Sequence, residues 1–187
     1  MSRPTAIVVA ALVLVPLLLT GCGREQPASE LVGVDTISSQ DRAEVPIIAG
    51  TTLDGEPFDV ADLRGRIVVV NSWASWCAPC REETPAFVEL AKGVDPGDVA
   101  VVGLNVTDDD AAARAFATEF GMPYPSIVDA EGDILATIPG VPPSSLPSTV
   151  ILDRDGRIAA RVIGATDALE LASLIAAIMD EEQVPAS

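Results

Sequence analysis

Two cysteines, Cys77 and Cys80, are the residues in this sequence best suited to chemistry. A pair separated by two residues could ligate a metal ion, close a structural disulfide, or exchange a disulfide with another molecule. A structural zinc site needs four ligands, and the sequence has no histidine and no second pair of this spacing. A disulfide across two residues closes so small a loop that it adds little stability. The pattern therefore favours redox chemistry.

The composition of the chain excludes several classes of function. The chain has 187 residues, 49% of them hydrophobic, which suits one folded domain with extensions at its ends. Lys+Arg 11 against Asp+Glu 28 gives a formal charge of -17, which argues against binding to nucleic acid. The absence of histidine removes Cys-His dyads and histidine general bases. We expect no cofactor and no metal.

The elements around the cysteines place them at the start of a helix. The β-branched run Ile67 to Val70 predicts a strand buried on both faces, and the pattern from Ala78 to Gly93 predicts a helix. Cys77 then lies where backbone N–H groups and the helix dipole stabilise a thiolate, so we expect it to be the nucleophile. Cys80, one turn later, could attack the resulting mixed disulfide.

The rest of the chain predicts an α/β domain. A small antiparallel pair is expected within residues 46–60, around Asp54-Gly55. Further strands are predicted at residues 99–106, 126–128, 148–153 and 157–164, and helices at 110–120 and 166–179. The order of these elements predicts a mixed sheet with helices on both faces.

The N-terminus has the features of an export signal. Ala6 to Leu19 is apolar but shorter than a membrane span, and Leu19-Thr20-Gly21-Cys22 resembles the bacterial lipobox, which implies lipid attachment at Cys22. An ordinary secretory signal and an uncleaved anchor are the alternatives. We predict a lipoprotein signal peptide at residues 1–21, a flexible tether at 22–44, the domain at 45–181 and a tail at 182–187.

The segment Val70 to Pro85, VNSWASWCAPCREETP, resembles the active-site segment of membrane-tethered thioredoxin-like proteins of the TlpA/ResA/DsbE group. The resemblance implies a thioredoxin-like fold with an N-terminal β-hairpin and an inserted strand-helix element that includes residues 110–120. It implies thiol:disulfide oxidoreductase activity, with Cys77 as nucleophile and Cys80 as resolving thiol. It also matches Pro147 to the family's cis-proline, which helps a substrate chain to pair.

Other residues near the cysteines carry further expectations. We expect Trp76, Ala78 and Pro79 to position substrate together with Pro147. Trp73 and Trp76 could equally be packing residues around the site. The Ala-Pro pair carries no positive side chain, so an extremely oxidising protein is not expected.

A proton acceptor for Cys80 is not obvious. Thioredoxins place a buried aspartate beneath the cysteines, whereas this chain has Asn71, as TlpA/ResA-like proteins do. The resemblance to ResA-like proteins points to Asp108 as a catalytic carboxylate, which would need a raised pKa. The alternative is that Asp108 caps the helix that comes after it.

These features predict a monomeric enzyme that exchanges disulfides with protein substrates on the outer side of the cytoplasmic membrane. As a reductase it would take electrons from a membrane donor of the CcdA/DsbD type and could serve cytochrome c maturation. As a DsbE-type oxidase it would need a quinone-coupled partner. The alternatives are an anchored binding module or a peroxiredoxin-like peroxidase, although Ala74-Ser75-Trp76 before Cys77 lacks the Thr-x-x-Cys context of a peroxidase.

Overall fold

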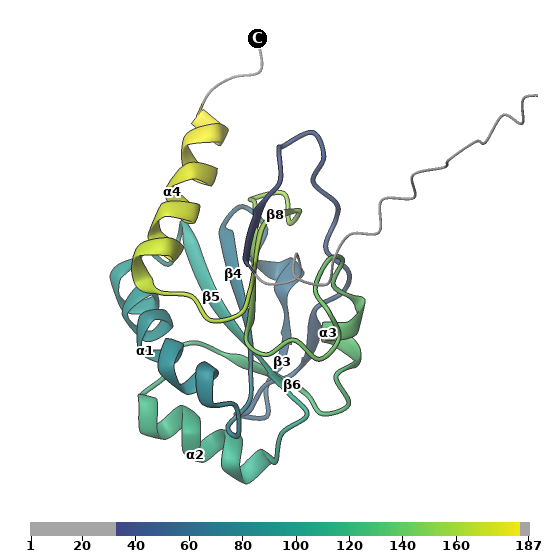
Figure 1. Cartoon of the computed structure of the whole chain (residues 1–187), viewed down its shortest axis with the longest axis vertical. Coiled ribbons are helices and arrows are strands. Elements are labelled where there is room, and N and C mark those ends of the chain that lie inside the picture. Colours follow the sequence, from purple (N-terminus) through teal and green to yellow (C-terminus); the bar gives the residue numbers. More distant parts are fainter. Residues whose placement is uncertain (1–32, 184–187) are drawn as a thin grey trace, which may run out of the picture.

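The central feature of the fold is a six-stranded mixed sheet, seen in a computed structural model that describes residues 33–183 (Figure 1). The strand order is β1-β8-β7-β4-β5-β6, in which β4, β5 and β6 run parallel and the other neighbours are antiparallel. The strands are β1 (Gly33–Thr36), β4 (Ile67–Trp73), β5 (Val99–Val106), β6 (Ser126–Asp129), β7 (Ser148–Leu152) and β8 (Ile158–Ile163). The predicted signal peptide and Cys22 lie outside the described residues.

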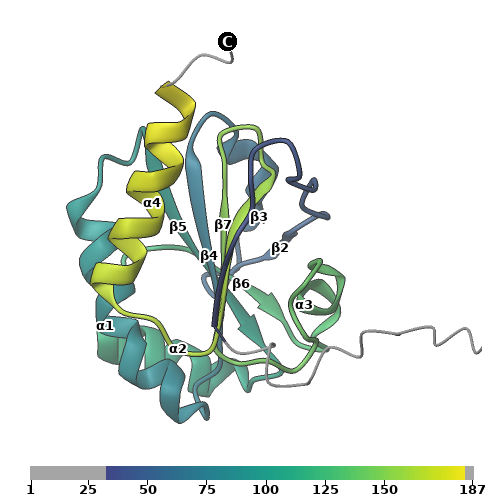
Figure 2. The same cartoon turned by 45° about the horizontal axis from the view of Figure 1, so that its top comes forward.

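Helices cover both faces of this sheet, as predicted. Helices α1 (Ala78–Gly93) and α4 (Ala168–Gln183) pack on one face, and Figure 2 shows α3 (Asp133–Thr137) on the other side. That second face also carries the predicted hairpin, β2 (Ala49–Thr51) with β3 (Pro57–Asp59), and the 3-10 helix η2 (Val60–Leu63). Helix α2 (Asp110–Phe120) connects β5 to β6 and matches the predicted bounds.

Strand β4 lies between β7 and β5 in the sheet, and every one of its residues is buried. Ile67 and Val69 contribute to the core beneath α1 and α4, while Val68 and Val70 contribute to the opposite core. A continuous β-branched run fills both cores at once, which is why it shows no polar alternation. The strand carries the chain directly to the cysteine turn at its end.

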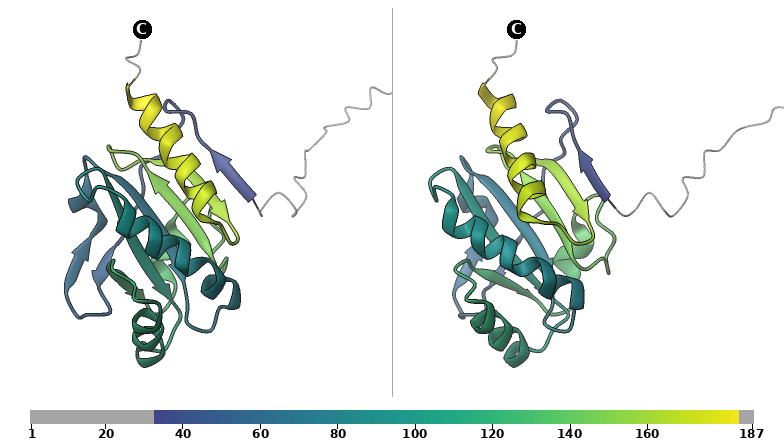
Figure 3. Two further views of the ribbon diagram at one scale, coloured as in Figure 1. Left: turned by 90° about the vertical axis from the view of Figure 1, so that its left-hand side faces the viewer. Right: turned by 60° about the vertical axis from the view of Figure 1, so that its left-hand side comes forward.

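The prediction of a flexible tether is wrong for residues 33–44. Strand β1 pairs with β8 along the sheet edge, from Gly33 opposite Ile163 to Thr36 opposite Ala160 (Figure 3). All four β1 residues are exposed, so backbone hydrogen bonds and the ion pair between Asp35 and Arg161, rather than apolar burial, hold the strand. A polar composition therefore gave no sign of it.

The other end of the predicted domain also shifts. Helix α4 begins at Ala168, two residues later than expected, because the Asp167 carboxylate accepts hydrogen bonds from the N–H groups of Leu169 and Glu170. The helix continues to Gln183, so the predicted tail does not begin at residue 182.

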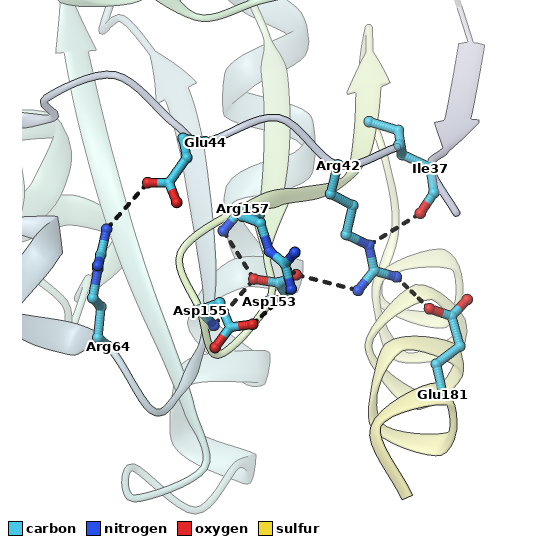
Figure 4. A network of polar contacts seen from close by, with 8 residues as sticks. All are labelled: Ile37, Arg42, Glu44, Arg64, Asp153, Asp155, Arg157 and Glu181. Atoms are coloured by element: carbon cyan, nitrogen blue, oxygen red, sulfur yellow. Dashed lines mark hydrogen bonds and ion pairs between the residues drawn. The ribbon is translucent and has the colours of Figure 1, made fainter. Parts of the chain in front are cut away.

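A polar network joins the segment after β1 to the turn between β7 and β8 and to α4 (Figure 4). The Arg42 side chain is only 3% exposed; its guanidinium lies 3.3 Å from the Asp153 carboxylate and donates to the Ile37 carbonyl at 3.1 Å. It also contacts Glu181 on α4. Arg42 therefore joins three segments that are distant in the sequence.

Candidate active site

The two cysteines occupy the junction predicted for them. Strand β4 ends at Trp73, the next residues form a turn closed by a 3.1 Å hydrogen bond from the Cys77 N–H to the Ala74 carbonyl, and Cys77 is the N-cap of α1. Cys77 and Cys80 form a disulfide, and the Cys77 sulfur accepts from the Cys80 N–H at 3.2 Å. The positive end of the α1 dipole thus points at Cys77.

Exposure distinguishes the two sulfurs and the residues beside them. Cys77 is 5% exposed and Cys80 is fully buried, so an incoming group would reach Cys77 first. Ala78 and Pro79 are exposed next to them. This order agrees with the predicted roles of nucleophile and resolving thiol.

The two tryptophans have different environments. Trp73 is 1% exposed and stacks on Phe116 of α2 with ring centroids 4.8 Å apart, so it is a packing residue. Trp76 is 63% exposed, and its indole N–H donates to the Thr107 carbonyl at 3.0 Å. Of the two, therefore, Trp76 presents a surface that a partner could contact.

Pro147 lies beside this site in the predicted conformation. The Leu146–Pro147 peptide bond is cis, and Leu146 packs against the cluster that contains both cysteines. Ser148 is then fixed to β4, because the Ser72 hydroxyl donates to the Ser148 carbonyl at 3.0 Å and accepts from its N–H at 3.1 Å. The start of β7 is thereby held next to the cysteine turn.

Glu83 is a buried carboxylate that was not predicted from the sequence. It lies three residues after Cys80 on the buried face of α1, a spacing that puts two side chains side by side on a helix. Its oxygens accept from the Asn71 amide at 2.7 Å and from the Thr166 N–H at 3.0 Å. Burial raises the pKa of Glu83 to about 7, although these two hydrogen bonds oppose the rise.

The burial of Glu83 had a signal in the sequence. Cys80, Glu83, Thr84 and Phe87 recur at helical spacing, and all four are buried. The helical spacing therefore marks Glu83 as a residue of the buried face despite its charge. A carboxyl group with a pKa raised to about 7, three residues after Cys80 on the buried face of α1, is a candidate proton acceptor for that thiol.

Asn71 takes part by orienting Glu83. Besides its bond to Glu83, its amide donates to the Thr149 hydroxyl at 3.3 Å. The residue that replaces the buried aspartate of thioredoxin thus supplies a donor to a carboxylate on the neighbouring helix. The buried carboxylate of this region is therefore on α1 and not on the strand.

The interpretation of Asp108 as the cap of α2 is wrong, and Asp108 does not have the raised pKa expected for a catalytic carboxylate. Burial raises its pKa, but hydrogen bonds from Ser75, Asn105 and the Asp109 N–H outweigh that effect, so the pKa of Asp108 is lowered overall. An anion stabilised in this way is a poor proton acceptor. Helix α2 is instead capped by Asp109, whose carboxylate accepts from the N–H groups of Ala111 and Ala112 at 3.0 Å.

A central strand that leads through a Cys-x-x-Cys turn into a helix, with a cis-proline before a neighbouring strand, defines the thioredoxin-like class. Within that class the chain belongs to the Redoxin family, whose model matches residues 39–178.

Known relatives agree with this assignment. Thiol-disulfide oxidoreductase ResA of Bacillus thuringiensis is 32% identical over 121 residues, which cover 65% of this chain and 68% of that protein. Thiol:disulfide interchange protein HelX of Rhodobacter capsulatus is 37% identical over 65% of this chain and 66% of its own length. The crystal structure of a DsbF homologue from Corynebacterium diphtheriae matches with a TM-score of 0.75 at 33% identity, covering 81% of this chain and 96% of that one.

The fold, the cysteine pair and the relatives together confirm a thiol:disulfide oxidoreductase of the TlpA/ResA/DsbE type. The thioredoxin-like fold predicted from the sequence is confirmed with it. Among residues 33–183, no helix is both long enough and apolar enough to cross a bilayer.

Proposed function

We propose that this enzyme reduces protein disulfides outside the cytoplasmic membrane, with Cys77 as nucleophile, Cys80 as resolving thiol and Glu83 as the proton acceptor of Cys80. The observation that carries the proposal is the position of Glu83, buried one helical turn from the buried sulfur and titrating near neutral pH.

The reaction has two exchange steps. In the reduced enzyme the Cys77 thiolate attacks a substrate disulfide, forming a mixed disulfide and releasing one substrate sulfur, which takes up a proton. Cys80 then gives its proton to the Glu83 carboxylate and attacks the Cys77 sulfur, which releases the second substrate sulfur. The substrate gains two electrons and the enzyme is left with the Cys77–Cys80 disulfide.

Substrate docking is assigned to the exposed residues around Cys77. The Trp76 ring, Ala78 and Pro79 form the surface beside the nucleophile, and Pro147 marks the edge where a substrate chain would pair. Protein substrates fit this arrangement because Cys77, itself 5% exposed, is flanked in the chain by the exposed residues Trp76 and Ala78. The cysteine pairs of apocytochrome c are the substrate class suggested by the resemblance to the TlpA/ResA/DsbE group.

The reducing direction is supported by the chemistry of the turn. Neither Ala78 nor Pro79 carries a positive charge that would stabilise the Cys77 thiolate, and a strongly stabilised thiolate is what makes a strong oxidant. A membrane donor of the CcdA/DsbD type would return electrons to the disulfide. Acting as a DsbE-type oxidase with a quinone-coupled partner is the competing possibility.

Equilibration with glutathione tests the direction. We expect a reduction potential below that of the glutathione couple, together with reduction of insulin in the presence of dithiothreitol and no consumption of peroxide. A potential well above glutathione would favour the oxidase. Peroxide consumption without insulin reduction would favour a peroxidase, and inactivity in both assays would favour a binding module.

We propose that the enzyme works as a monomer, held at the membrane by lipid on Cys22. The lipobox-like sequence before Cys22 supports the anchor. Cys22→Ser should release the protein from membranes or block its processing, while the purified domain keeps full exchange activity. Equal detergent partitioning of the variant and the parent would contradict the anchor, and a concentration-dependent dimer in sedimentation would contradict the monomer.

A further inference from the structure

The turn that carries Cys77 is fastened to the end of β5 by one carboxylate. Asp108 accepts from the Ser75 N–H at 2.6 Å through one oxygen and from the Ser75 hydroxyl at 2.7 Å through the other. The Trp76 indole N–H adds a third link at 3.0 Å, to the Thr107 carbonyl. Two consecutive residues immediately before Cys77 are thus bonded to two consecutive residues after β5.

The carboxylate is equally fixed on its own side. Asn105 donates to Asp108 at 2.9 Å, and the Asp109 N–H donates to its other oxygen at 2.9 Å. Thr107, directly before it, has φ 45°, a left-handed conformation that costs a residue other than glycine about 1 kcal/mol or more. A loop held in a strained conformation by bonds on both sides is a rigid support.

We propose that Asp108 is a positioning residue, which holds the Cys77 turn in place and keeps a fixed negative charge near the nucleophile. Ser75 is two residues before Cys77, so chain geometry puts the carboxylate within about 10 Å of the Cys77 backbone. The inference rests on the proposed role of Cys77 as nucleophile. It gives Asp108 a part in setting the reduction potential without any proton transfer.

The expected effect on the potential has a definite sign. A negative charge disfavours the Cys77 thiolate, which makes the reduced enzyme less stable and the enzyme a stronger reductant. The α1 dipole opposes this effect. The other ionisable groups on the two helices that flank the turn are Arg81, Glu82, Glu83, Glu89 and Lys92 on α1 and Asp110, Arg114 and Glu119 on α2, with Asp109 as the N-cap of α2. Within this set, Arg81 pairs with Glu119 and Arg114 pairs with Asp110.

Three variants separate charge from position. Asp108→Asn removes the charge and keeps an acceptor for Ser75. Ser75→Ala keeps the charge and removes one bond of the link. Asp109→Asn is the matched control, because it makes the same change in net charge at the next residue and asparagine caps a helix as well as aspartate does.

The measurements are the equilibrium with glutathione and the rate at which Cys77 forms a mixed disulfide with glutathione disulfide. Asp108→Asn should shift the equilibrium toward the reduced enzyme by roughly five- to tenfold, tenfold being about 30 mV, whereas Asp109→Asn should shift it less than about twofold. Ser75→Ala should leave the equilibrium within about twofold and slow mixed-disulfide formation about threefold.

Two results would overturn the inference. Equal equilibrium shifts in Asp108→Asn and Asp109→Asn would show that the location of the Asp108 charge beside the Cys77 turn is irrelevant. An unchanged rate of mixed-disulfide formation in Ser75→Ala would show that the bonds between Ser75 and Asp108 do not position Cys77. If the parent itself fails to equilibrate with glutathione, the proposed function fails instead. Denaturant unfolding of each variant identifies any rate change that arises from loss of folded protein.

Discussion

Two buried carboxylates lie at opposite ends of the central strands and differ in what surrounds them. Glu83 and Asp153 are each 3% exposed. Asp153 lies next to the guanidinium groups of Arg42 and Arg157, and it also accepts from backbone N–H groups (Figure 4). Glu83 accepts only from the neutral groups of Asn71 and Thr166 among the contacts seen in residues 33–183.

The difference teaches that burial alone does not decide what a carboxylate does. A buried charge that is paired with a countercharge holds two parts of the fold together, because removing either partner leaves the other charge buried without compensation. A buried carboxylate without a cation is costly as an anion, so its pKa rises and it becomes able to exchange protons near neutral pH. The domain keeps the first kind of group far from the cysteines and the second kind beside them.

Removing the countercharge of Asp153 should cause the largest loss of folding stability among the predictions made here. Arg42→Ala leaves Asp153 with less compensation and detaches α4 from the segment after β1, so we expect a loss of about 3 kcal/mol in the free energy of unfolding. Arg64→Ala is the control, because Arg64 and its partner Glu44 are both exposed and such pairs contribute at most about 1 kcal/mol. Denaturant unfolding measures both. Equal losses would mean that burial of the pair is unimportant.

The raised pKa of Glu83 predicts a pH-dependent cost to stability. This pKa is about 7 in the folded protein against 4.5 for an unperturbed glutamate, so between these values the folded state holds a proton that the unfolded state has lost. Stability therefore falls as pH rises through this window, by roughly 2 to 3 kcal/mol between pH 5 and pH 8.

Glu83→Gln should abolish this part of the pH dependence. The free energy of unfolding is measured at pH 5 and at pH 8 for the oxidised variant and the oxidised parent. Between these two pH values the parent should lose roughly 2 to 3 kcal/mol more than the variant. Parallel stability curves would mean that Glu83 is ionised throughout the range, as it would be beside a cation.

Glu83→Gln should also slow one step of disulfide exchange. With no carboxylate to take the Cys80 proton, the resolution of the mixed disulfide at pH 7 should slow by about ten- to a hundredfold, while its formation by Cys77 changes little. Glu82→Gln, an exposed neighbour on α1, should leave both rates unchanged. Stopped-flow measurement of each step distinguishes them. Equal slowing by both variants would point to net charge instead of proton transfer.

Elements marked by patterns of apolar residues could be predicted from the sequence. The run Ile67 to Val70, the bounds of α1, β5 and α2, and the place of the cysteines at a helix start were all correct because burial imposes a repeat on the residue types. The cis bond before Pro147 was also correct, from the resemblance.

Features that depend on long-range polar contacts could not be predicted. Strand β1 has exposed residues and is held by backbone hydrogen bonds and an ion pair, so no apolar pattern marks it. Arg42 reaches Asp153 and Glu181, more than a hundred residues away. The buried environment of Glu83 was not predicted, and the pKa direction expected for Asp108 was wrong, because the pKa of a carboxylate depends on its burial and on donors that come from other elements.

The most direct test of the central claim is trapping of the mixed disulfide by single-cysteine variants. Cys80→Ser leaves Cys77 at the exposed end of α1 with no resolving thiol, so it should accumulate a covalent complex with a protein disulfide substrate such as insulin. Cys77→Ser leaves only the fully buried Cys80 and should accumulate little. Non-reducing electrophoresis and mass spectrometry quantify both complexes. Trapping mainly by Cys77→Ser would contradict the assignment of Cys77 as nucleophile and of Cys80 and Glu83 as the resolving pair.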